Sequence, residues 1–204
     1  MKLIYGTGNV NKKEQVESFF RAMSIDVEIT SLKEIKFDRE IIENGTTFEE
    51  NSLIKALAIK EFCDEKNIKG IIVTDDSGLC VNALNGLPGV HSARYAGDHA
   101  PQEVTLKKLL DEMEKIKSKD RSAKFECVLT AILEDGQRIV AKGETLGRIK
   151  HKPGPMGKLT YGPIFVPDGF DRCLNELKPE ELGTTHREKA FLELIEKIKE
   201  VKGL

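Results

Sequence analysis

Two adjacent carboxylates, Asp75 and Asp76, are the residues whose type and position most readily suggest chemistry. They follow the apolar run 70–74, which has the length and β-branched composition of a buried strand, and they precede Ser77-Gly78. We expect the strand to end at these acids, where loops leaving an open α/β sheet form ligand-binding crevices. Alternatively, Asp75 caps a turn and Asp76 is solvated, because Asp, Ser and Gly are ordinary turn residues. The four residues taken alone favour this second interpretation.

A second candidate lies near the N-terminus, where a short strand at 2–5 is broken by Gly6-Thr7-Gly8-Asn9. Apolar residues then recur at helical spacing, which predicts a helix opening near Asn9 or Asn11. A loop that enters a helix offers backbone N–H groups and the positive end of the helix dipole, which together suit a phosphate. Lys12 adds a full charge. The pattern is neither a Walker loop nor a G-x-G-x-x-G fingerprint, so a plain helix cap explains it equally well in isolation.

The third candidate is a pair of polar residues, Asn51 and Lys55, on one face of a predicted helix. Two overlapping capping-box patterns, at 46–49 and 47–50, predict that this helix runs to about Asp64. Its expected core-facing stripe consists of Leu53, Ile54, Leu57, Ala58 and Phe62. Asn51 and Lys55 then lie on a solvated face unless another element brings a ligand to them.

The remaining pattern predicts further strands and two helices that would position these side chains. Strands are expected at 27–30, 125–133, 138–141, 143–149 and 164–166, with a hairpin turn at 134–137. One helix follows Pro101, and another follows His186 and Arg187. A cation at a helix start opposes the helix dipole, which functional sites tolerate. An exposed basic pair explains His186 and Arg187 equally well.

Composition narrows the class of protein. The 204 residues suffice for one sizeable core, and 39% hydrophobic with 32% charged residues is typical of a globular chain. The net charge of −2 argues against a general nucleic-acid binder. No apolar run has the length of a signal peptide or a membrane span, so we expect a cytoplasmic protein without membrane partners. The four scattered cysteines favour buried, reduced thiols.

Taken together and in order, the motifs resemble one family, the inosine triphosphate pyrophosphatases, which are also called dITP/XTP pyrophosphatases. The resemblance spans nearly the whole chain, and the ordered set is highly specific although each piece is weak. The matching segments are Thr7-Gly8-Asn9-Val10-Asn11-Lys12, Gly45 to Asn51, Asp75-Asp76-Ser77-Gly78-Leu79, Leu87 to Gly97, Tyr161 with Pro163-Ile164-Phe165, and Thr185-His186-Arg187.

The resemblance implies an α/β fold with two lobes around a long mixed β-sheet and flanking helices, residues 1–204 forming a single domain. It also implies a homodimer and a Mg²⁺-dependent hydrolase that converts a nucleoside triphosphate to the monophosphate and pyrophosphate. The implied substrates are deaminated purines such as ITP, dITP and XTP. Such chemistry needs a metal, cations and a carboxylate that can deprotonate water.

By the same resemblance, Asp76 is the principal acid, as general base and metal neighbour, and Glu43 is the second metal carboxylate. Glu40 or Glu50 could serve in place of Glu43. The remaining implied substrate contacts form a larger set. Phosphates would be bound by Thr7, Gly8, Asn9, Val10, Asn11 and Lys12, the nucleotide by Ser77 and Tyr161, and the base or sugar by His186 and Arg187, with Asn51 and Lys55 facing the cleft.

The chain departs from the family where the base is read. Leu159 and Gly162 stand where relatives carry a stacking aromatic and an acid, and Leu182 stands where they carry a base-contacting lysine. The sequence therefore leaves open the same hydrolysis with altered or broader base specificity. A nucleotide-binding protein with weak turnover is a further alternative, which the retention of Asp76, Lys12 and the acidic loop that carries Glu40 and Glu43 disfavours.

Overall fold

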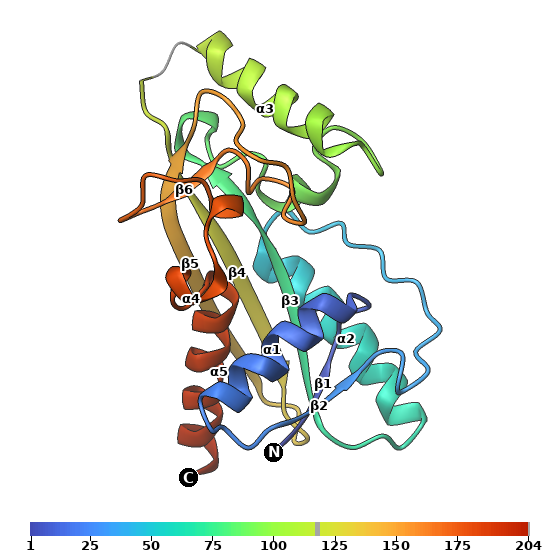
Figure 1. Ribbon diagram of the computed structural model, residues 1–204. Coiled ribbons are helices and arrows are strands. Elements are labelled where there is room, and N and C mark those ends of the chain that lie inside the picture. Colours follow the sequence, from blue (N-terminus) through green and yellow to red (C-terminus); the bar gives the residue numbers. More distant parts are fainter. Residues whose placement is uncertain (117–118, 204) are drawn as a thin grey trace. The chain divides into compact units, whose positions relative to one another are not determined.

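Six strands form one mixed sheet in the computed structural model, which describes residues 1–116 and 119–203, without the side chains of Val10 and Asn11. The strand order is β2-β1-β3-β4-β5-β6 (Figure 1). β1 pairs in parallel with both of its neighbours, whereas β5 and β6 are antiparallel. The expected mixed α/β sheet is thereby confirmed. The strands are β1 (Lys2–Tyr5), β2 (Glu28–Ser31), β3 (Ile71–Val81), β4 (Ser122–Ile132), β5 (Arg138–Ile149) and β6 (Phe165–Pro167).

The helices are α1 (Val10–Ala22), α2 (Phe48–Glu65), α3 (Gln102–Ile116), α4 (Pro179–Leu182) and α5 (His186–Lys202), with three short 3₁₀ turns at Asn82–Leu84, Gly89–Arg94 and Leu174–Glu176. Four helices, α1, α2, α3 and α5, begin close to the residues that the sequence indicates, whereas the short α4 was not predicted. Two strand predictions are wrong. β3 continues through Asp75 and Asp76 to Val81 instead of ending there, and β5 is one strand rather than two. A strand can include both Asp75 and Asp76, because successive side chains point to opposite faces of the sheet.

The chain divides into two compact units. Unit 1 comprises residues 1–76, 127–143 and 187–204, and unit 2 comprises residues 77–126 and 144–186. β3, β4 and β5 each contribute residues to both.

In unit 1, alternation along the strands builds a core on each face of the sheet. Leu3, Tyr5, Ile71 and Val73 pack with the apolar stripes of α1 and α5. The intervening residues Ile4 and Ile72 pack with α2. In Figure 1, α1 and α5 accordingly lie next to one another. Successive residues along β1 and along β3 therefore face different helices. The same alternation applies to the polar residues farther along β3.

The buried face of α2 differs from the predicted stripe. Its buried residues are Phe48, Asn51, Ser52, Ala56, Ile59, Phe62 and Cys63, whereas Leu57 is 42% exposed. Ser52 can be buried because its hydroxyl lies 3.1 Å from the Thr74 carbonyl oxygen, and the Thr74 hydroxyl donates to the Ser52 carbonyl at 2.6 Å. Asn51 is buried as well, so the expectation of a solvated face there is wrong. Apolar residues alone do not reveal this face.

Unit 2 has a core of its own, in which α3 packs with β3 and β6 residues and with Tyr161. In α3, Leu106, Leu109 and Met113 are buried, whereas Ile116 at its end is exposed. In the last helix, α5, Phe191, Leu194, Ile195 and Ile198 are buried, whereas Val201 is exposed.

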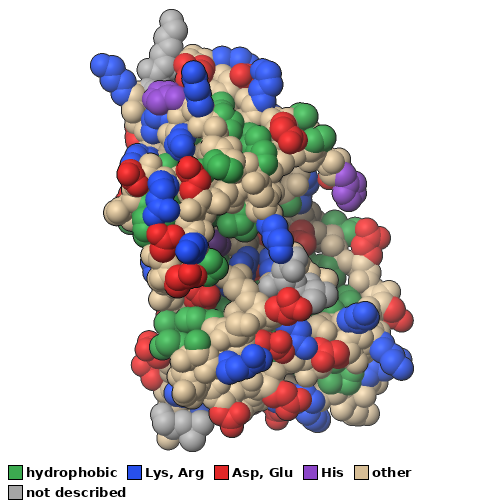
Figure 2. Space-filling model, viewed as in Figure 1, with side chains coloured by type: hydrophobic (Ala, Val, Ile, Leu, Met, Phe, Trp, Pro, Cys, Tyr) green, Lys and Arg blue, Asp and Glu red, His purple; other side chains and the backbone are tan. Residues whose placement is uncertain are grey.

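The surface and the thiols agree with the composition. Acidic and basic side chains are interspersed on the face of the molecule in Figure 2. Among the described helices, none has the length and hydropathy to cross a membrane. Cys63, Cys127 and Cys173 are buried free thiols as expected, and Cys80 is partly buried.

The start of α2 provides a test of the fold. Thr47 forms the capping box with Glu50, whereas Thr46 only donates to the same carboxylate. We expect Thr47→Ala to lower the free energy of unfolding by about 1 kcal/mol, because a helix N–H loses its acceptor. Thr46→Ala is the matched control with a smaller loss, and urea unfolding measures both. Equal losses would contradict the assignment of Thr47 as the cap.

Candidate functional site

The two central acids leave β3 on opposite faces. Asp75 points to the side of the sheet that carries α1 and α5, where it contacts Lys12 and Arg187. Asp76 points to the side of α2, where it contacts Asn51 and Lys55. Both acids belong to unit 1. Sequence adjacency therefore does not make them a paired carboxylate site.

Asp75 is a buried carboxylate with three partners. Its side chain is 1% exposed and accepts hydrogen bonds from the Tyr5 hydroxyl and the Lys12 ammonium, each at 2.9 Å. An Arg187 nitrogen lies 3.5 Å from the same oxygen that Lys12 contacts. Burial alone would raise the pKa of Asp75, but the positive charges of Lys12 and Arg187 outweigh it and hold the pKa well below its usual range. Asp75 therefore neither caps a turn nor lies in solvent.

Arg187 is held inside unit 1. Its side chain is 11% exposed, and its guanidinium also donates to the Gln15 side chain at 3.1 Å. Burial opposes its charge, yet Asp75 outweighs burial and raises the pKa of Arg187. Burial and the neighbouring Asp75 likewise raise the pKa of Tyr5, which therefore donates as a neutral phenol. The interpretation of His186 and Arg187 as an exposed basic pair is wrong for Arg187.

Asp76 is more accessible than Asp75 and lies in a cluster of polar side chains. Asn51 donates to one of its oxygens at 3.0 Å, and the Lys55 ammonium lies 3.9 Å from the other. Lys55 also donates to Glu43 at 2.5 Å. The Asp76 side chain is 16% exposed and that of Glu43 is 35% exposed. The structure thus brings together four predicted site residues, with Lys55 between two carboxylates.

Asn51 connects the acidic loop to Asp76. While its amide nitrogen donates to Asp76, its amide oxygen accepts the backbone N–H of Gly45 at 2.8 Å. A Cβ at Gly45 would lie 2.7 Å from that oxygen, so the close approach requires glycine. Glu50 is engaged differently, because its carboxylate accepts hydrogen bonds from Thr46 and Thr47 at the start of α2. This role disfavours Glu50 as the alternative metal carboxylate.

The loop between β1 and α1 is shaped by packing on one side and open on the other. A Cβ at Gly6 would lie 2.6 Å from Ile59 and Thr74, whereas one at Gly8 would meet nothing within 4 Å. The Thr7 hydroxyl accepts the Asn9 N–H at 3.1 Å, and the Asn9 carbonyl accepts the first N–H groups of α1. The predicted contacts of Val10 and Asn11 involve side chains outside the described part of the chain.

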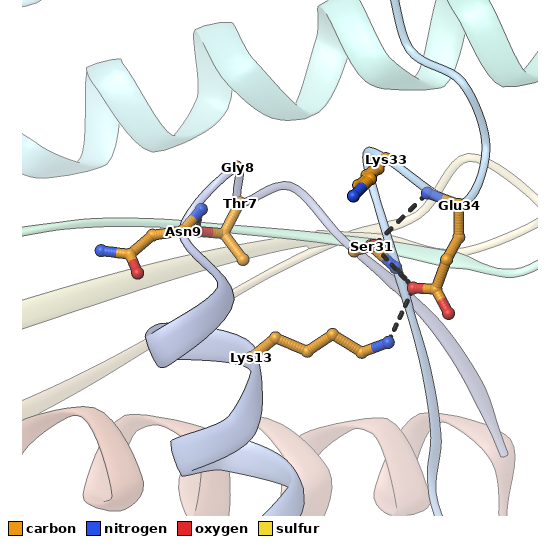
Figure 3. A pocket seen from close by; sticks show the side chains of 7 residues that line it. All are labelled: Thr7, Gly8, Asn9, Lys13, Ser31, Lys33 and Glu34. Carbon is orange, nitrogen blue, oxygen red and sulfur yellow. Dashed lines mark hydrogen bonds and ion pairs between the residues drawn. The ribbon is translucent and has the colours of Figure 1, made fainter.

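A cavity of about 450 Å³ adjoins this loop. Its lining residues come from the ends of β1 and β2 and from α1 (Figure 3). They are Thr7, Gly8, Asn9, Lys13, Ser31, Lys33 and Glu34. The last four were missed by the sequence interpretation. Lys13 follows Lys12 directly, but only the pairing of β1 with β2 brings Ser31 next to the loop.

Three of the predicted nucleotide contacts belong to unit 2. Ser77 is partly buried in β3. The Tyr161 side chain lies in the apolar core, and its hydroxyl donates to the Ser92 carbonyl at 2.8 Å. The His186 ring stacks on Phe125, with ring centres 5.3 Å apart and an angle of 17°. The predicted substrate contacts of these residues stay predictions.

Asp75 makes stability depend on pH. Its folded-state pKa is depressed, so its stabilising effect is complete above its unfolded pKa of about 3.9 and is lost as the pH falls from there toward the folded pKa. We expect Asp75→Asn to cost about 3 kcal/mol at pH 7, because Arg187 and Lys12 lose their buried counterion.

The pH dependence distinguishes this mechanism from simple loss of packing. Between pH 4 and pH 3 the wild type should lose about 1 kcal/mol more than Asp75→Asn, since only its unfolded state gains a proton at this position. Denaturant unfolding at each pH measures the difference. A constant gap from pH 7 to pH 3 would contradict the depressed pKa.

The chain is similar to known proteins over nearly its whole length. The model of the Ham1 family matches residues 3–197. A protein named dITP/XTP pyrophosphatase from Caldanaerobacter subterraneus subsp. tengcongensis is 39% identical over 200 residues, which cover 97% of this chain and 96% of that protein. The structure of a HAM1 protein from Coxiella burnetii is 30% identical with a TM-score of 0.86, covering 98% of this chain and 99% of that one. The Staphylococcus aureus Ham1 protein is also 30% identical, with a TM-score of 0.82 and coverage of 99% and 100%. The chain therefore belongs to the Ham1 family.

Proposed function

We propose that the chain is a nucleoside triphosphate pyrophosphohydrolase that acts on non-standard purine nucleotides such as ITP, dITP and XTP. The single observation that carries this proposal is the Asp76 cluster, in which a partly exposed carboxylate is oriented by Asn51 and faced by Lys55. Relatives that are named dITP/XTP pyrophosphatases and match nearly the whole length of the chain support the substrate class.

In the proposed reaction, water attacks the α-phosphorus of the triphosphate. Asp76 accepts the proton of this water as the new O–P bond forms, and the bond from the α-phosphorus to the bridging oxygen breaks, releasing pyrophosphate with the electron pair. Asn51 donates to Asp76, which fixes the orientation of the carboxylate. Lys12 and Lys55 supply positive charge where negative charge builds up on the phosphate oxygens.

The residues present fit a Mg²⁺ ion. Glu43 and Asp76 offer hard carboxylate oxygens, and the Lys55 ammonium between them balances only one of their two negative charges. Within residues 1–116 and 119–203, no cluster of three or more candidate metal-ligating side chains occurs. Mg²⁺ is usually held by only one or two carboxylates together with substrate phosphates, so a two-carboxylate set is adequate. When bound, the ion would neutralise charge on the phosphates, and Asp76 and Glu43 would hold it.

The base specificity forms a narrower part of the proposal. Gly162 lies in unit 2, and Asn175 fills the space that a side chain at position 162 would need. A Cβ at Gly162 would lie 2.0 Å from the Asn175 amide oxygen. Leu182 packs against the apolar core of the same unit, and Leu159 is 53% exposed. A pocket with fewer polar groups discriminates less sharply between bases. We therefore retain broader base specificity as the second candidate.

We also propose that residues 1–204 act as one domain and that the protein works as a cytoplasmic homodimer without nucleic-acid partners. The resemblance to the family supports the dimer, and the net charge of −2 supports the absence of nucleic acid. Light scattering of the purified protein tests the dimer directly.

The central test combines a nucleotide panel with Asp76→Asn. Pyrophosphate release in the presence of Mg²⁺ should be fastest with ITP, dITP or XTP, and Asp76→Asn should reduce kcat by about 10²–10⁴-fold because the general base is lost. Asp38→Asn, which changes an exposed acid in the same way, should leave kcat unchanged. Equal turnover by folded Asp76→Asn would overturn the role of Asp76. Binding without turnover of any nucleotide by the wild type would favour the nucleotide-binding alternative.

A separate prediction concerns Gly162, the position at which relatives carry an acid. Gly162→Asp should destabilise the protein by about 1–3 kcal/mol, because Asn175 must turn away and lose its bond to the Pro155 carbonyl. Asn175→Ala should remove most of this cost in the double variant, a non-additivity that a double-mutant cycle measures. The ratio of kcat/KM for XTP to that for ATP should rise in the double variant. An unchanged ratio would argue against altered specificity at Gly162.

A further inference from the structure

The cavity beside the loop after β1 lies at a sheet edge that suits a ligand. β1 and β2 are parallel and Tyr5 is in register with Ser31, so both strands end at the same edge. Ligands of open α/β sheets bind outside the carboxyl ends of strands, for this strand order typically between β1 and β3, and the cavity lies at the same edge on the β2 side of β1. The cavity lies between the segments that follow these two ends (Figure 3). Its volume of about 450 Å³ is within the range of small-molecule sites.

Donors in the cavity converge on a single anionic oxygen. One oxygen of Glu34 accepts the Ser31 backbone N–H at 2.7 Å, the Ser31 hydroxyl at 2.6 Å and the Lys13 ammonium at 2.6 Å. Hydrogen bonds from Lys13 and Ser31 lower the pKa of Glu34 to about 2. A backbone N–H, a hydroxyl and an ammonium are the donors that proteins use for phosphate oxygens. The carboxylate of Glu34 thus occupies an anion-binding arrangement that the chain itself provides.

Release of Glu34 would leave two lysines for a second anion. Lys13 and Lys33 line the cavity together with Glu34, and one further acid, Glu17, lies 3.4 Å from the Lys13 ammonium. The Glu34 side chain is 51% exposed, so it can turn into solvent at small cost and release its donors. Successive residues of a helix point about 100° apart. Lys12 accordingly reaches Asp75 while Lys13 reaches the cavity, which places cations on both sides of the predicted phosphate loop.

We propose that this cavity binds the terminal phosphates of the substrate and the pyrophosphate product. Lys13 and Lys33 contact these phosphates, and the phosphates displace the carboxylate of Glu34. The inference rests on the proposed function and adds the residues that distinguish a triphosphate from a monophosphate. Nothing in it depends on the identity of the base.

Isothermal titration with inorganic pyrophosphate tests the cavity without requiring turnover. We expect Lys13→Met and Lys33→Met to raise the Kd by about three- to tenfold, as expected for the loss of one partly exposed charge contact. Glu34→Gln should lower the Kd, because a competing negative charge is removed while an acceptor for Ser31 remains. Lys2→Met is the matched control, an exposed lysine at the opposite end of β1, and should leave the Kd unchanged. Ionic strength is held constant, because salt screens such contacts.

A nucleoside monophosphate provides the second arm of the test. The Kd for IMP should be the same in the wild type and in all three cavity variants, since IMP lacks terminal phosphates. In turnover, Lys33→Met should lower kcat/KM for the best triphosphate. Wild-type pyrophosphate affinity in all three variants, equal losses for IMP and pyrophosphate, or no pyrophosphate binding by the wild type would each overturn the inference.

The outcomes also separate this inference from the proposed function. A wild type that hydrolyses nucleoside triphosphates, with cavity variants that bind pyrophosphate normally, overturns the cavity alone. A wild type that hydrolyses none of them, with pyrophosphate binding that depends on Lys13 and Lys33, supports the cavity and overturns the proposed function.

Discussion

The buried charge of Asp75 is the constraint on which the arrangement of unit 1 depends. A carboxylate with a 1% exposed side chain cannot stay ionised without close partners, and its partners come from three different elements. Tyr5 ends β1, Lys12 lies in α1, and Arg187 lies in α5. Because all three must reach one carboxylate, the loop after β1 is fixed relative to β3. The predicted phosphate loop thus has a defined position before any ligand arrives.

Strand alternation places the two neighbouring acids, Asp75 and Asp76, in different environments. Asp75 faces the helices that hold the fold together, whereas its neighbour Asp76 faces α2 and stays partly accessible. If β3 ended before these residues, their side chains would extend from a loop and would not be held on opposite faces of the sheet. The continuous β3 gives Asp76 a rigid backbone and gives Asp75 a buried environment. Functional groups on regular elements are held more accurately than groups on loops.

Much of this was open to prediction from sequence. Periodicity and capping patterns located β1, α1 and α2, because those signals depend on residues within one or two turns. The motifs that resemble the family singled out Asp76, Lys12 and the acidic loop as candidate site residues. The path of β3 through Asp75 and the burial of Asn51, Ser52 and Arg187 were not predictable, since each depends on a hydrogen-bond partner far away in the sequence. The cavity at Ser31 and Glu34 depends on strand pairing for the same reason.

The Asn51 side chain bridges Gly45 and Asp76 in one direction only. Its oxygen accepts from the Gly45 backbone, and its nitrogen therefore faces the carboxylate. Turning the amide over would place an oxygen against Asp76 and a nitrogen against an N–H, so both bonds would be lost together. The bridge therefore has one allowed orientation. It ties the backbone at Gly45, two residues after Glu43, to the orientation of Asp76.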